Sequence, residues 1–420
     1  MSSAVAPTSG ASLAARFSQV RRRTLELCRP LTPEDMMVQS CPEASPAKWH
    51  LAHTAWFFES FILREFLTGY REFHPDFHWL FNSYYQSFAA FPEKRLRSSF
   101  SRPSLEEILA FRAHVDQAME RLLDSDLPAE ALARIELGVN HEEQHQELLL
   151  TDILHAFFTN PLRPAYNPAP LEIPTETAPL AFLPFPGGLV EIGHDGSGFS
   201  FDNERPRHKA WLEPYALASR LVTCGEFAAF IADGGYMRPE LWLSAGWDTV
   251  QSEGWRAPLY WTERDGAWSI FTLSGELSLA ALSAAPVSHI SFYEADAYAR
   301  WARHRLATEF EWEAAAAGTE IQRDPADSGV FMPMPASSLT QNENAAKQCW
   351  EWTASAYLPY PGFKPLPGSL GEYNGKFMSG QMVLRGGSCV TPTAHIRASY
   401  RNFFAPQTRW QFSGIRLAKS

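Results

Sequence analysis

At 420 residues the chain is long enough to form two domains, each with its own hydrophobic core. Its 36 lysines and arginines stand against 47 aspartates and glutamates, a net charge of −11, which argues against a nucleic-acid partner. No apolar run approaches the length of a membrane span. Five scattered cysteines without a C-x-x-C pair predict a reducing, cytoplasmic location and no disulfide framework.

The first elements in chain order predict a tail and two helices. Residues 1–11 lack a basic start and an apolar core, so we expect a disordered tail rather than a signal peptide. Residues 12–28 predict a helix with a loose apolar stripe at Leu13, Phe17, Val20, Leu25 and Cys28. Ser45 and Pro46 form a helix start signal, and the helix that follows carries His50 and His53 on one face.

An irregular aromatic stretch, residues 74–91, comes next and contains Tyr84 and Tyr85. Packing over a helical bundle is the ordinary role of such tyrosines. A small basic cluster follows, and by itself it indicates a solvated face: Lys94, Arg95 and Arg97. Ser104 and Glu107 then form a capping box that opens a third helix ending near residue 123.

A fourth helix is predicted over residues 129–158, and it carries His141 and His145. Residues four apart lie on one helical face, so both imidazoles can reach one point, where they would suit iron or zinc. The letters H-E-E-Q-H also fit a zinc peptidase with Glu142 as general base, although no histidine of the extended metzincin pattern follows. A third ligand must come from another helix, and His50 and His53 are both candidates.

The second half has a different character. Eight prolines between residues 161 and 186 predict a linker. Residues 187–420 are rich in glycine and tryptophan, and only 223–233 and 291–304 have a helical pattern, so we expect an irregular α+β domain there. The domain prediction is therefore a four-helix bundle over residues 12–160, the linker over 161–186 and the α+β domain over 187–420.

These motifs resemble one family when they are taken in order. The segments W-H-L-A-H-T (49–54) and H-E-E-Q-H-Q-E-L (141–148) resemble a DinB-like four-helix bundle. The second half resembles the formylglycine-generating-enzyme domain, a C-type-lectin-like fold, in five segments: P-V-S-H-I-S (286–291), A-T-E-F-E-W-E (307–313), W-E-W-T (350–353), L-R-G-G-S (384–388) and S-G-I-R-L (413–417). The fusion is similar to the iron(II)-dependent sulfoxide synthases of ergothioneine biosynthesis and, more distantly, to ovothiol synthases.

The resemblance implies a reaction and a set of ligands. In the family, dioxygen couples the thiol of cysteine or γ-glutamylcysteine to C2 of the hercynine imidazole, and the product is a sulfoxide. Carried over to this chain, iron(II) would be held by His53, His141 and His145, with His50 as a neighbour. Gln144 would hydrogen-bond the hercynine imidazole.

The resemblance also implies substrate pockets. Asn402, with Phe403 and Phe404 after it, would contribute to the pocket for the trimethylammonium group, to which an aromatic face is attracted. The family's two thiol-binding arginines align with Lys94 and Arg97, with Arg95 beside them. A lysine cannot make the bidentate carboxylate fork, which favours free cysteine over γ-glutamylcysteine.

Tyr84 or Tyr85 would supply the proton, because this tyrosine pair resembles the branch of the family that uses cysteine. The formylglycine-generating enzymes need a reactive cysteine pair, and only Cys389 lies in the matching region, so that chemistry is predicted to be absent. Three hypotheses stay open at this point. They are the sulfoxide synthase, with γ-glutamylcysteine as donor or ovothiol-type 5-sulfoxidation as variants, the zinc peptidase, and a non-catalytic binding protein.

Overall fold

The computed structural model describes residues 10–168, 171–317, 329–336 and 348–420. The chain divides into two compact units. The first comprises Met1–Asn160, Gly196–Phe201 and Pro365–Asn374, and the second comprises Pro161–Asp195, Asp202–Lys364 and Gly375–Ser420. Most of the predicted N-terminal tail lies outside the described residues. No helix in the described ranges is long and apolar enough to cross a membrane.

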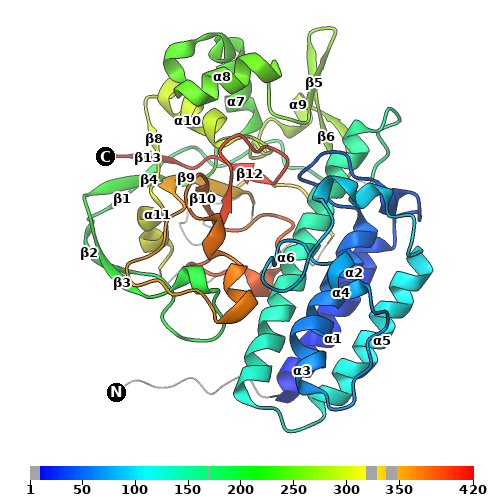
Figure 1. Ribbon diagram of the computed structural model, residues 1–420. Helices are drawn as coiled ribbons and strands as arrows, with labels where there is room; N and C mark the ends of the chain where they lie inside the picture. The colour runs from blue at the N-terminus through cyan, green and yellow to red at the C-terminus, as the bar shows by residue number, and fades with distance from the viewer. Residues whose placement is uncertain (1–9, 169–170, 318–328, 337–347) are drawn as a thin grey trace. The chain divides into compact units, whose positions relative to one another are not determined.

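The first unit is built on long helices, and the predicted ones are confirmed with small shifts at their ends. The bounds are α1 Gly10–Cys28, α2 Ala47–Phe58, α5 Leu105–Leu123 and α6 Ala129–Thr159. Helix α6 packs against α1 and α2, and α2 packs against α5 (Figure 1). Shorter elements complete the unit: the π-helical turn η2 Glu59–Leu63, α3 Arg64–Phe66, α4 Phe77–Leu80 and the 3-10 helix η3 Lys94–Ser99.

Local sequence explains how these helices begin and pack. Ser104 and Glu107 form the predicted capping box at the start of α5. In α1, one member of the predicted stripe was wrong: Leu25 is exposed, whereas Thr24 and Leu27 are buried. The reason is the helical period, because Thr24 follows Phe17 by two turns and therefore repeats its direction, which Leu25 does not.

The second unit contains the strands. Their bounds are β1 Phe182–Phe185, β2 Gly188–Ile192, β3 His208–Leu212, β4 Tyr215–Ala218, β5 Trp261–Arg264, β6 Ala267–Thr272, β7 Gly275–Ser278, β8 Arg305–Leu306, β9 Trp350–Ala356, β10 Met382–Arg385, β11 Asn402–Phe404, β12 Ser413–Gly414 and β13 Leu417–Lys419. Two four-stranded sheets have the orders β1-β4-β13-β8 and β11-β10-β9-β12. A two-stranded β2-β3 sheet and a three-stranded β5-β6-β7 sheet accompany them. Strands β2, β3, β5 and β6 are labelled in Figure 1.

Among the described residues of this unit the α-helices are α7 Cys224–Ala232, α8 Ser244–Glu253, α9 Leu279–Leu282, α10 Phe292–Trp301 and α11 Glu309–Ala316. The two predicted helical stretches are confirmed as α7 and α10, while α8, α9 and α11 were missed. The capping box of Thr308 and Glu311 was the available signal for α11.

The predicted linker was also too long. Its last residues form β1, which pairs antiparallel with β4 from Phe182 opposite Ala218 to Phe185 opposite Tyr215. Pro184 lies in an edge strand of this sheet, which is where proline is tolerated in β-structure. The architecture is thus the predicted one, a helical bundle followed by an α+β domain.

Candidate metal centre

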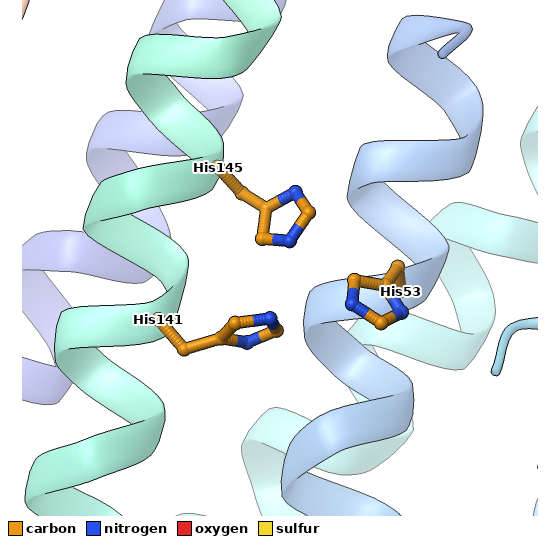
Figure 2. Close-up of side chains that lie close together, drawn as sticks. All are labelled: His53, His141 and His145. Atoms are coloured by element: carbon orange, nitrogen blue, oxygen red, sulfur yellow. The ribbon is translucent and has the colours of Figure 1, made fainter. Parts of the chain in front are cut away.

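Three histidines converge inside the first unit. His53 comes from α2, and His141 and His145 come from adjacent turns of α6 (Figure 2). One ligand nitrogen from each of the three lies within 4.8 Å of the others. Within the described residues this is the cluster of histidine, cysteine and acidic side chains that meets the geometry of a metal site. The structure therefore brings together the three residues that the resemblance implied.

Stacking and one hydrogen bond fix the orientation of His53. Its ring lies between Trp49 and Trp56, with centroids 4.4 Å and 5.1 Å away and nearly parallel planes. Nδ1 lies 2.6 Å from the carbonyl oxygen of Phe81 and donates to it, so Nε2 keeps its lone pair. Within the described ranges, buried Nε2 of His53 and Nδ1 of His141 have no hydrogen-bond partner. Orphaned buried nitrogens of this kind fit a bound metal.

All three rings are uncharged at neutral pH. Burial lowers the pKa of His53 well below its ordinary value, and the nearby His141 lowers it further. Burial likewise lowers the pKa of His141 to about 3 and that of His145 well below its usual range. Neutral imidazoles are the form that binds a transition metal, and they suit iron or zinc.

His50 lies outside the cluster but contacts one of its members. Its Nδ1 is 2.8 Å from Nδ1 of His145, and its Nε2 is 3.0 Å from Oδ2 of Asp152. The backbone N–H of Ser45 donates to the same carboxylate oxygen at 2.8 Å. The sequence motifs alone did not distinguish His50 from His53 as the third ligand. In the structure His53 belongs to the histidine cluster, whereas His50 contacts Asp152.

Glu142 faces away from the histidines. It is fully buried and accepts hydrogen bonds from Arg21 at 2.9 Å, Arg112 at 2.9 Å and Thr24 at 2.7 Å. Burial by itself would raise the pKa of Glu142, but the two arginines lower it to about 2. A peptidase general base must reach the metal-bound water, and a carboxylate held between two buried arginines does not. The geometry disfavours the zinc-peptidase hypothesis.

The predicted tyrosines approach the histidine cluster through one intervening aromatic side chain. Tyr84 and Tyr85 stack with centroids 4.6 Å apart, and the buried ring of Tyr85 lies 5.7 Å from Trp56, which itself stacks on His53. Burial raises the pKa of Tyr85 well above its ordinary value, and the neighbouring Tyr84 raises it further, so the phenol keeps its proton.

The sequence interpretation missed a third tyrosine, Tyr373, which belongs to the first unit although it lies far along the chain. Its ring is 5.7 Å from the ring of His141, and its hydroxyl donates to Oε1 of Gln144. The carboxylate of Glu372 accepts from the backbone N–H groups of Gln86 and Ser87, just after the tyrosine pair.

The basic cluster divides into three different environments. Arg97 is buried, lies 3.4 Å above the ring of Trp49 and donates to Oγ of Ser45. Burial lowers the pKa of Arg97 to about 9, and it stays cationic at pH 7. Arg95 is exposed and pairs with the exposed Glu93, and Lys94 donates to a backbone carbonyl. Only Arg97 is packed next to the residues that surround the metal centre.

The predicted trimethylammonium pocket belongs to the second unit. Asn402, Phe403 and Phe404 form β11, and the Asn402 amide oxygen accepts from the next backbone N–H. The ring of Phe403 stacks on Tyr357 with centroids 4.0 Å apart. All three residues of β11 are partly exposed, so an aromatic surface is available within this unit.

Comparisons with known proteins also find a helical N-terminal part and a different C-terminal domain. Residues 16–150 match the DinB superfamily, and residues 174–343 and 334–420 match the sulfatase-modifying factor enzyme 1-like domain. A hercynine oxygenase of Mycolicibacterium smegmatis is 31% identical over 442 residues, which cover 97% of this chain and 98% of that protein. One from Mycobacterium tuberculosis is 32% identical over 439 residues, 98% of this chain and 99% of its own length.

The chain belongs to the hercynine oxygenase family. It is therefore an oxidoreductase, and the predicted fusion of a DinB-like bundle with a formylglycine-generating-enzyme-like domain is confirmed. The formylglycine-generating enzyme of Streptomyces coelicolor is 29% identical over 312 residues, which cover 60% of this chain and 93% of that enzyme. In this chain, all five cysteines are free of disulfide bonds, and Cys389 is buried.

Proposed function

We propose that the protein is an iron(II)-dependent sulfoxide synthase that joins the sulfur of L-cysteine to C2 of the hercynine imidazole. The observation that carries the proposal is the buried, neutral histidine cluster in a chain whose relatives over almost its entire length are hercynine oxygenases. The reaction balances without an added reductant. The thiol loses its S–H hydrogen and the imidazole its C2 hydrogen, one oxygen atom of O2 enters the sulfoxide, and the other leaves as water.

Iron(II) would be held by His53, His141 and His145. Three neutral protein ligands leave several positions open for small molecules. When bound, iron supplies one-electron chemistry with dioxygen and a positive charge that favours the thiolate form of the sulfur donor.

Other side chains of the first unit would position the substrates. Gln144 precedes a ligand on α6, its amide oxygen accepts a hydrogen bond from Tyr373, and it would hydrogen-bond the hercynine imidazole. Arg97 would bind the cysteine carboxylate. Ser45 occupies one of its five donors, which leaves others for a carboxylate fork.

Two further sets of residues complete the proposal. Tyr84 or Tyr85 would supply the proton, since Tyr85 stays protonated in its buried setting. In the second unit, Asn402 and the aromatic pair Phe403 and Phe404 would bind the trimethylammonium end of hercynine by cation–π attraction.

The test is anaerobic reconstitution with iron(II), followed by hercynine, dioxygen and one thiol at a time, with mass analysis of the product. Cysteine should give hercynyl-cysteine sulfoxide, and the His145→Ala variant should give none. A tenfold or greater preference for γ-glutamylcysteine in kcat/KM contradicts the choice of donor. Sulfur attached at C5 of histidine indicates ovothiol-type chemistry instead. Protein that is loaded with iron and still forms no C–S bond with either thiol contradicts the function itself.

A further inference from the structure

The contact between His50 and His145 joins two nitrogens of the same kind, and one proton must lie between them. Both are Nδ1 atoms, 2.8 Å apart, and both side chains are buried. Two lone pairs at that distance would repel each other, and so would two N–H groups. One ring is therefore the donor and the other the acceptor, and the rest of the structure decides which.

Asp152 decides the direction. A carboxylate only accepts hydrogen bonds, so the 3.0 Å contact with Nε2 of His50 places a proton on that nitrogen. If Nε2 carries the single proton of the His50 ring, Nδ1 has a lone pair and accepts there. His145 then donates from its own Nδ1, and its Nε2 is left with the lone pair that a metal needs.

The carboxylate is itself held in place. The backbone N–H of Ser45 donates to Oδ2, the same oxygen that faces His50, and Ser45 accepts from Arg97 through its hydroxyl. Helix geometry keeps the members together. Asp152 follows His145 by seven residues, so both lie on one face of α6, and His50 and His53 are three apart on α2.

We propose that His50 and Asp152 form a relay that fixes the tautomer of His145 and reserves its Nε2 for the metal. His50 is then a positioning residue rather than a ligand. The inference rests on the proposed metal site and deepens it. His53 is oriented by a backbone carbonyl, so this side-chain relay acts on one ligand of the cluster and can be removed by mutation. Partners that orient a ligand in this way contribute about 10- to 100-fold to metal affinity.

The direct test is the tautomer of His145 in the metal-free wild-type protein. Histidine labelled with ¹⁵N and observed by long-range ¹H–¹⁵N correlation distinguishes the two neutral tautomers, and the His145→Ala variant assigns the signal. We expect the proton on Nδ1. A proton on Nε2 would overturn the relay, whatever the protein's activity.

The second test is cobalt(II) titration followed through the ligand-field absorption. His50→Leu removes both hydrogen bonds, whereas the amide of His50→Gln can accept from His145 and donate to Asp152. We expect cobalt affinity about 10- to 100-fold weaker in His50→Leu and recovered to within about threefold in His50→Gln. His155→Leu, a change at a half-buried α6 histidine bonded to Ser40, is the matched control and should bind as wild type.

The outcomes separate the relay from the site. Wild-type protein that binds no cobalt contradicts the metal centre, whereas equal binding by wild type and His50→Leu overturns the relay alone. Circular dichroism of the metal-free variants checks that they are folded. If His50→Leu is unfolded, Asp152→Ala, which removes the acceptor for His50, takes its place, and unchanged affinity in that folded variant also overturns the relay.

Discussion

Arg97 offers the sharpest test of how the sulfur donor is bound, because the chain contains its own control two residues away. Arg97 is 5% exposed and packed on Trp49, whereas the Arg95 side chain is 69% exposed and paired with Glu93. A hydrogen bond to a charged group in such a setting contributes about 1.5–3 kcal/mol, and every 1.4 kcal/mol is about tenfold. Replacing Arg97 by glutamine should therefore lower kcat/KM for cysteine by about 10- to 100-fold.

The assay is steady-state sulfoxide formation with each substrate varied while the other is saturating. We expect Arg97→Gln to raise the KM for cysteine and leave that for hercynine within about twofold, while Arg95→Gln changes neither, as is usual for an exposed ion pair. An equal rise in both KM values in Arg97→Gln would refute carboxylate binding. It would mean that the arginine acts through Trp49, which stacks on His53.

Three further predictions concern the first unit. Replacing Tyr84 and Tyr85 together by phenylalanine should slow sulfoxide formation by about 100-fold or more and divert oxygen to thiol oxidation, and an unchanged product ratio by mass analysis would exclude both. Glu142→Gln should keep iron content but lower the free energy of unfolding by about 3–5 kcal/mol in urea titrations, because buried arginines lose their counter-charge; loss of turnover at unchanged stability would restore a general-base role. Gly138→Ala should destabilise by about 1–2 kcal/mol by the same measurement, because its Cβ would meet the buried Phe58 ring at 2.7 Å; a more stable variant contradicts this.

Sequence reasoning succeeded where the signal was local. The spacing of His141 and His145 on an uninterrupted helix placed both on one face, and the Ser104 capping box marked the start of α5. It could not choose between His50 and His53, because residues three apart share a face and only the packing of α2 against α6 separates them. The resemblance made that choice.

Sequence reasoning could not predict features that depend on contacts between distant parts of the chain. Lys94, Arg95 and Arg97 read as one charged cluster, but the 3-10 turn η3 directs Arg97 inward and leaves Arg95 in solvent. Tyr373 has no periodic or spacing signal, since its position depends on contacts with residues more than 200 positions earlier, such as Gln144. Periodic patterns within a helix can be predicted from one sequence, whereas contacts between residues far apart in the chain depend on the fold.

The membership of Pro365–Asn374 in the first unit has a consequence for how the protein is made. A ribosome that adds about 5–20 residues per second needs roughly 10–40 s to pass from Asn160 to Pro365. During that interval the nascent chain already contains all three histidines of the cluster, while Tyr373, which holds Gln144, has not been synthesised. The bundle therefore emerges as an incomplete unit, and its last segment joins it only after most of the second unit has been translated.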